Sequence, residues 1–131
     1  MNYLIVSLAL FATGAWAQDE VLFADSPHRS VSRTRQVLDA ADLRVLLPLG
    51  YVYTSERGAL DGRKGVIENR LYQRSVAGVM DTEQYVVELA IINGVSGGYE
   101  FAIKGHRDRG ETRLSNPDLS GIHREFLSLI R

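Results

Sequence analysis

The densest run of charged side chains in this chain is KGHRDRGETR, at residues 104–113. Guanidinium groups bind carboxylates and phosphates through paired hydrogen bonds, and the start of a helix adds partial positive charge. Because a helix is expected soon after this run, Arg107, Arg109 and Arg113 predict an anion- or carboxylate-binding site. The alternative is a solvated loop whose opposite charges pair loosely, each pair being worth under about 1 kcal/mol. The run by itself favours this alternative.

Two motifs in and after this run follow the pattern of a known family. The first motif, Gly-His-Thr-Asp at the end of a strand, is matched by Gly105, His106 and Asp108. The second motif, Asn-x-x-Leu-Ser-x-x-Arg on the next helix, is matched by Asn116, Leu119 and Ser120. About a quarter of the chain therefore resembles part of an OmpA-like peptidoglycan-associating domain.

In that family, the Asp and the Arg hold the zwitterionic end of a peptidoglycan stem peptide. The resemblance therefore implies peptidoglycan as a ligand and Asp108 as one of the residues that bind it. His123 occupies the position of the Arg, and Arg124 lies one place later, about 100° further around a helix. Arg107 replaces the Thr of the first motif, and the family has a helix where residues 82–92 favour a strand.

No catalytic or metal-binding pattern frames the remaining polar residues. His28, His106 and His123 lack the close spacing of zinc ligands, and the chain contains no cysteine. Ser115 and Ser120 are close to His123, but no Gly-x-Ser-x-Gly elbow frames either serine. We therefore predict no catalytic residue, no metal and no cofactor, and we keep a small secreted hydrolase as an open alternative.

The first stretch of the chain, MNYLIVSLALFATGAWA, is apolar and free of charged side chains. It ends in a small-x-small pattern, which predicts a signal peptide at residues 1–17 with cleavage after Ala17. The alternative is a short membrane anchor, but a spanning helix needs roughly 20 apolar residues and charges begin at Asp19. We therefore expect a periplasmic or secreted protein with no membrane span after cleavage.

The charge and the cysteine count limit what the mature chain can be. The formal net charge of −1 argues against a general nucleic-acid-binding protein, which would need a basic surface. Because there is no cysteine, packing alone has to hold an exported fold together, without disulfides. Removing the leader leaves 131 − 17 = 114 residues, which is the size of one domain.

Periodicity predicts one α+β domain over residues 32–131, preceded by a flexible arm at 18–31 with a short extended piece at 21–24. A mainly antiparallel sheet of about four strands is expected, packed by an N-terminal helix and a C-terminal helix. The strands are expected in LPLGYVYTS, VIENRLYQRSVAG, DTEQYVVELAIING and YEFAIKG. The third segment has a helical alternative, because Asp81 and Gln84 have the spacing of a capping box.

The two helices have recognisable ends and apolar faces. Ser32 is expected to cap the first helix, and Asn116 the last one, with Pro117 in its first turn. The apolar face of the first helix is Val37, Leu38, Ala41 and Val45. The apolar face of the last helix is Leu119, Ile122, Phe126 and Ile130.

These observations together predict an exported, non-catalytic binding or assembly module. It would contact another envelope or secreted protein through a sheet face or edge, and the arm or an unpaired edge would add a strand to that partner. Peptidoglycan binding is the first alternative. The residues expected to bind a ligand or partner are His106, Arg107, Asp108, Arg109, Arg113, His123 and Arg124.

Overall fold

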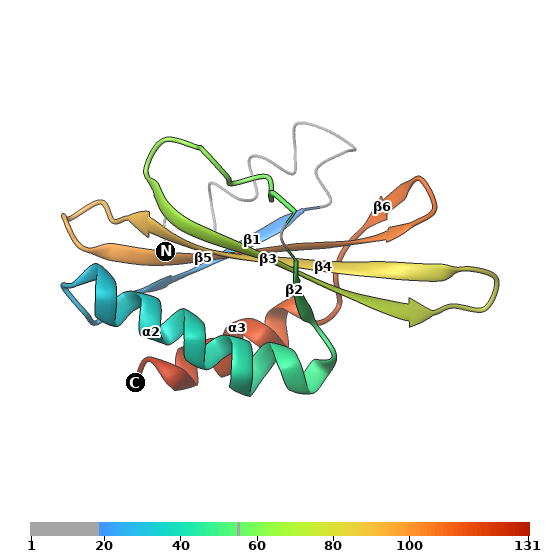
Figure 1. Cartoon of the computed structure of the whole chain (residues 1–131), viewed down its shortest axis with the longest axis horizontal. Helices are drawn as coiled ribbons and strands as arrows, with labels where there is room; N and C mark the ends of the chain where they lie inside the picture. The colour runs from blue at the N-terminus through green and yellow to red at the C-terminus, as the bar shows by residue number, and fades with distance from the viewer. Residues whose placement is uncertain (1–18, 55) are drawn as a thin grey trace.

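The computed structural model describes residues 19–54 and 56–131, so the predicted signal peptide lies outside the described residues. The fold is α+β, with a six-stranded antiparallel sheet and both α-helices beneath one of its faces (Figure 1). The strands are β1 Glu20–Asp25, β2 Val52–Thr54, β3 Val66–Ala77, β4 Thr82–Asn93, β5 Tyr99–Arg109 and β6 Thr112–Leu114. The α-helices are α2 Val31–Ala41 and α3 Leu119–Leu129. Neither of these described helices has the length and apolar character needed to cross a membrane.

The strands follow the order β1-β5-β4-β3-β2, and β6 also pairs with β5. One edge of β5 is paired with β4 along its whole length. On its other edge, β1 pairs with residues 100–105 and β6 pairs with residues 107–109. The first strand and the last strand therefore lie end to end along the same edge of β5.

The sheet has more strands than the sequence predicts, because the extended piece expected at 21–24 belongs to a sheet strand, β1, and because β6 was not expected. The flexible arm expected at 18–31 contains β1, whose six residues are all in register with β5. Pairing also buries apolar surface, since Ala24 is part of the core and Leu22 packs against it. The expected loop after residue 105 is a continuation of β5, which Gly110, with φ of 58°, turns back into β6.

The expected strands correspond to β2, β3, β4 and β5. Residues 82–92 form part of a strand, as the β-branched residues favoured, and the helical alternative is wrong. Only the end of LPLGYVYTS is extended, because Leu47–Leu49 is a 3-10 turn that ends at Gly50 with φ of 95°. This glycine takes the left-handed conformation that closes the turn.

Helix α2 begins two residues earlier than expected. Its cap is Ser30, whose hydroxyl accepts a hydrogen bond from the Arg33 N–H at 3.1 Å, instead of the expected Ser32. A π-helical turn, Asp42–Leu46, continues the helix towards Pro48. The predicted apolar face is confirmed, since all four of its residues are buried: Val37, Leu38, Ala41 and Val45.

The core lies between the sheet and the two helices. Alternate residues of β4 and β5 enter it, and the Phe101 ring meets the Phe126 ring of α3 edge-on, with centroids 4.8 Å apart. The opposite sheet face, which we call the open face, is partly covered by the segment at residues 56–65 (Figure 1). Side chains of the charged run at 104–113 are thus distributed between a helix-covered face and an open face.

Candidate functional site

Strand alternation separates the residues that the sequence grouped into one site. A Cβ atom added to Gly105 would lie 2.9 Å from the Leu119 Cδ1 atom of α3, so odd positions of β5 point towards the helices. Arg107 and Arg109 therefore lie on the helix-covered side, at the end of the sheet. His106 and Asp108 point to the open face. The predicted site of three arginines is not assembled, because only Arg113 joins the open face.

Arg107 and Arg109 are tied to one carboxylate. They donate to the two oxygens of Glu83 at 3.0 and 2.8 Å, and the Arg107 Nε also donates to the Ser115 carbonyl at 2.8 Å. The hydrogen bond from Arg109 is the main cause that lowers the pKa of Glu83. Both guanidinium groups are therefore committed to positioning the β4 and β5 ends.

The open face holds a pocket of about 260 Å³ beneath the segment at residues 57–59. We call it the open-face pocket. Its apolar floor is formed by Leu71 and Val86. Its charged lining consists of Asp19, Arg57, Glu88, Lys104, His106, Asp108 and Arg113. The pocket therefore contains three of the residues that the sequence selected, and four charged residues that it did not.

His106 is the titratable centre of this pocket. Its Nε2 atom lies 3.2 Å from an Asp108 oxygen, and its Nδ1 atom lies 3.4 Å from an Asp19 oxygen. Burial lowers the pKa of His106, and this effect outweighs the two carboxylates that act in the opposite direction. A neutral imidazole beside Asp108 could exchange protons with a ligand. However, the described lining holds no serine, threonine or cysteine, so the pocket supplies no hydroxyl or thiol for a hydrolase triad.

Glu88 is a pocket residue outside the set of binding residues predicted from the sequence. Glu88 is only 3% exposed. Its carboxylate accepts hydrogen bonds from the Leu60 N–H at 3.0 Å and the Asn69 amide at 2.9 Å. Gly58 passes directly over it, since an added Cβ atom would lie 2.2 Å from a carboxylate oxygen. Alternation along β4 indicates the open face for Glu88, but no local signal shows that a distant segment covers it.

His123 and Arg124 lie on α3, on the other side of the sheet from Asp108. The His123 Nε2 atom lies 3.0 Å from the Phe23 carbonyl of β1, so this histidine ties the helix to the edge strand. Arg124 lines a separate groove between helices. The structure therefore does not bring Asp108 together with either basic residue. The pairing that the OmpA-like resemblance implies is not assembled.

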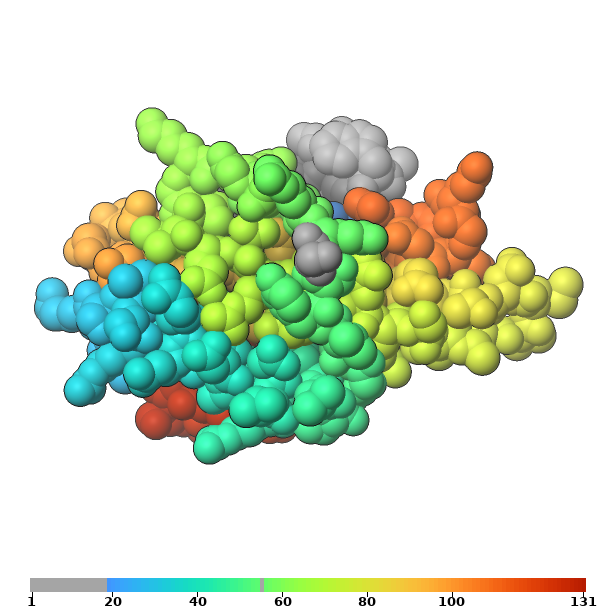
Figure 2. Space-filling model, viewed as in Figure 1, coloured from blue at the N-terminus to red at the C-terminus, as the bar shows by residue number. Residues whose placement is uncertain are grey.

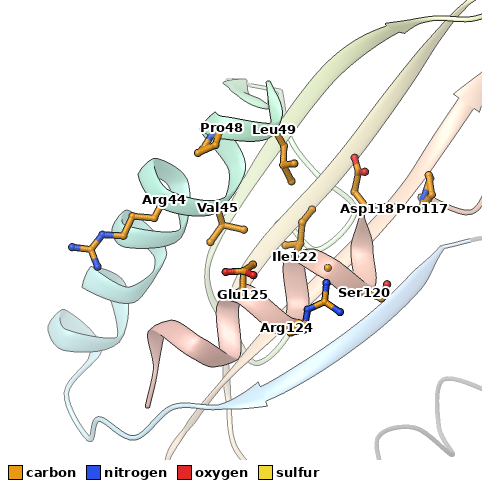
Figure 3. A pocket seen from close by; sticks show the side chains of 11 residues that line it. Arg44, Val45, Pro48, Leu49, Pro117, Asp118, Ser120, Ile122, Arg124 and Glu125 are labelled. Carbon is orange, nitrogen blue, oxygen red and sulfur yellow. The ribbon is translucent and has the colours of Figure 1, made fainter.

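The groove that contains Arg124 runs between α3 and the segment that follows α2 (Figure 3). Its volume is about 470 Å³, and we call it the helix-side groove. Figure 3 shows Pro48 and Leu49 on one wall, with Ile122 and Arg124 on the other. Ser120 and Gly121 also line it.

An exposed apolar surface adjoins the helix-side groove. We call it the apolar strip, and its members are Leu43, Leu47, Leu49, Val52 and Tyr53. Each of these residues is between 41% and 66% exposed. Figure 2 shows the segment that carries them as a continuous teal-to-green band across one side of the molecule. The sequence pattern did not identify this surface, because Leu43, Leu47 and Leu49 fall outside the apolar face predicted for the first helix.

A buried polar network fixes α3 against the sheet. Asn116, expected as a helix cap, is 2% exposed and donates to the Tyr51 hydroxyl at 2.9 Å and the Val86 carbonyl at 3.2 Å. Its side-chain oxygen accepts from the Asp118 N–H, while Asp118 itself is the N-cap residue. Arg74 donates to Asp118 at 2.9 Å, and burial raises the pKa of Tyr51. This network is closed and serves the fold.

Comparison of the chain with models of protein families, with curated proteins and with solved structures finds no match.

Proposed function

We propose that this protein is an exported, non-catalytic binding module that contacts another envelope or secreted protein through the apolar strip. One observation carries the proposal. Of the nine large apolar side chains that are exposed among the described residues, five lie within the eleven residues from Leu43 to Tyr53. A concentration of exposed apolar side chains in one segment is typical of a protein–protein interaction site.

The strip includes an edge of the sheet. In the described part of the chain, the strand order ends at β2, which pairs only with β3. An edge strand presents backbone N–H and C=O groups that can pair with a strand of another chain. Val52 and Tyr53 alternate to opposite faces, and both are more than half exposed. A partner strand laid along β2 would therefore meet an apolar side chain on each face.

The helix-side groove adds a cavity beside the apolar strip. Leu49 belongs to both the strip and the groove, and Pro48 and Val45 continue the apolar wall inward. A large apolar side chain of the partner, placed beside the strip, would fit into a cavity of about 470 Å³. Burying an apolar side chain in such a site contributes roughly 1.5–3 kcal/mol, which makes the groove a suitable position for an anchor residue.

Export is the second part of the proposal and is supported by the leader at residues 1–17. Its apolar segment and its Ala-Trp-Ala end have the form that a signal peptidase processes. Mass spectrometry of the native protein should find a mature chain that begins at Gln18. An intact Met1 on a cytosolic protein would contradict this part of the proposal.

Site-specific photo-crosslinking in the producing cells tests the surface directly. A photoreactive amino acid replaces Leu47, Tyr53 or Val95 in separate full-length chains. Val95 is the control, because it is 90% exposed and lies in the β4–β5 connection, outside the strip. We expect one discrete product from positions 47 and 53 and none from position 95. Equal products from all three positions, or none at all, would reject the strip as an interface.

A charge-insertion pair separates loss of binding from loss of folding. Leu47→Asp combined with Tyr53→Asp should abolish the crosslinked complex, because it places two charges in the contact. Val79→Asp introduces a charge at a fully exposed side chain in the β3–β4 turn, outside the strip. Circular dichroism should show the same fold in both variants. Retention of the complex by the double variant would contradict the proposal.

A further inference from the structure

The open-face pocket contains arginines whose hydrogen-bonding capacity is not used. Among the described residues, seven arginines form ion pairs, and five of these hold a carboxylate at 3.0 Å or less. The remaining two, Arg57 and Arg113, have no carboxylate contact shorter than 3.4 Å. Both line the open-face pocket. The two ion-paired arginines of the described chain that have only long carboxylate contacts thus face the same cavity.

Both side chains can reach an incoming ligand. The side chain of Arg57 is 88% exposed, and its carboxylate contact is with Asp61, which is outside the lining of the pocket. The side chain of Arg113 is 46% exposed, and its 3.4 Å contacts are with Asp19 and Asp108. A guanidinium group carries five N–H donors, and contacts at 3.4 Å are close to the limit of hydrogen bonding. Most of this donor capacity is therefore available.

The acidic residues of the pocket, in contrast, already have closer donors. Lys104 holds Asp19 at 2.7 Å, and His106 lies 3.2 Å from Asp108. Glu88 accepts a backbone and an amide hydrogen bond and is covered by Gly58. Asp19 is thus paired with Lys104 and Glu88 is shielded, whereas Arg57 and Arg113 have no partner as close as that of Asp19. This difference favours an anion over a cation as the ligand.

We propose that the open-face pocket binds an anionic oxygen-bearing group, a carboxylate or a phosphate, between Arg57 and Arg113. Guanidinium groups bind both kinds of group through paired, charge-assisted hydrogen bonds. A cavity of about 260 Å³ accommodates such a group with a small substituent on the apolar floor. The His106 imidazole also lines the pocket, with its two ring nitrogens facing Asp19 and Asp108. This site shares no residue with the apolar strip.

The test is a titration of the purified ¹⁵N-labelled protein, followed by NMR, with sodium phosphate and sodium acetate as separate probes. Sodium chloride keeps the ionic strength constant. We expect saturable shifts of backbone amides at residues 57–60 and 106–113. Saturation by phosphate alone assigns a phosphate group, saturation by acetate alone a carboxylate, and saturation by both the shared oxyanion chemistry. The absence of saturable shifts with either probe would overturn the proposal.

Two variants of the same hairpin make the test specific. Arg113→Gln should weaken the binding of the saturating anion about tenfold, as expected for loss of a charged hydrogen-bond donor. Arg109→Gln removes the same charge on the helix-covered side of the sheet, where the guanidinium group is bound to Glu83. This variant should leave the affinity for the anion unchanged. An equal loss in both variants would mean a general charge effect and would also overturn the proposal. The NMR spectra themselves report whether each variant is folded.

Discussion

On the helix-covered side of the sheet, Arg74 holds the Asp118 carboxylate at 2.9 Å, whereas on the open face Arg113 reaches Asp108 and Asp19 only at 3.4 Å. The Arg74 guanidinium also lies over the Tyr85 ring, 4.6 Å from its centroid. Both arginines belong to networks of several polar groups, but Arg74 is held by a short bond to its carboxylate and Arg113 only by long ones. The difference indicates that the closed network maintains the fold, while the loose network is free to rearrange around a ligand.

Removing the centre of the closed network should cause the largest loss of stability. Asn116→Ala should lower the free energy of unfolding by about 3 kcal/mol, because it leaves Tyr51 and Val86 without a buried hydrogen-bond donor. Urea denaturation measures this change. Asn93→Ala, at an exposed position, is the matched control and should have little effect. A loss below about 1 kcal/mol would show that Asn116 does not stabilise the fold as argued.

The next largest effect concerns the close approach of α3 to β5. In Gly105→Ala, the added methyl group would lie 2.9 Å from the Leu119 Cδ1 atom and 3.0 Å from the Val86 carbonyl oxygen. We expect a loss of about 2 kcal/mol in the free energy of unfolding, as is typical of overpacking. Gly98→Ala is the control, since no heavy atom lies within 4 Å of its added Cβ. Similar melting curves for the two variants would refute the tight packing at Gly105.

The same substitution at Arg74 and at Arg113 compares how much each arginine contributes to stability. Arg74→Gln should cost about 1.5 kcal/mol, because it loses charged hydrogen bonds and a cation–π contact. Arg113→Gln should change stability by less than about 0.5 kcal/mol, since its contacts are long and largely exposed. Chemical denaturation curves of both variants measure the two changes in unfolding free energy. A larger loss at Arg113 than at Arg74 would reverse the argument.

The smallest expected effect is a dependence on pH that arises from His106. Burial lowers the pKa of this imidazole in the folded state, so the unfolded chain takes up the proton first as the pH falls. The folded state therefore loses stability from about the usual value of 6.5 downwards, until the folded-state pKa is passed. We expect the unfolding free energy of His106→Gln to depend less on pH than that of the wild type in this window. Parallel curves for both proteins would contradict a lowered pKa.

The sequence could predict those parts of the fold that are recorded in local periodicity. Alternation in YEFAIKG correctly placed Phe101 and Ile103 on one face, and the buried residues of α2 followed the helical period. The extended piece at 21–24 was predicted but its pairing in β1 was not, and β6 was missed, because both pairings depend on an edge of β5 that only the folded sheet presents. The formation of these two strands therefore depends on contacts with β5 and not on their own sequence alone.

The candidate site shows the same limit. The charged run was selected correctly as the richest in polar groups, but it was treated as a loop after residue 105. Continuing the strand would have separated Arg107 and Arg109 from His106 and Asp108 by alternation alone. The contribution of Arg57 and Glu88 could not be predicted, because it depends on a segment that folds over β4 from almost thirty residues earlier in the sequence.

Asp19 forms part of the wall of the open-face pocket, only two residues after Ala17, the proposed cleavage position. Maturation at that peptide bond would leave Gln18 as the first residue and create a new α-ammonium group one peptide unit from Asp19. Such a group titrates near pH 8, so most molecules would carry the extra positive charge at neutral pH. Trimming of the precursor would then do more than release the chain: it would make the entrance to the pocket more attractive to anions only after delivery.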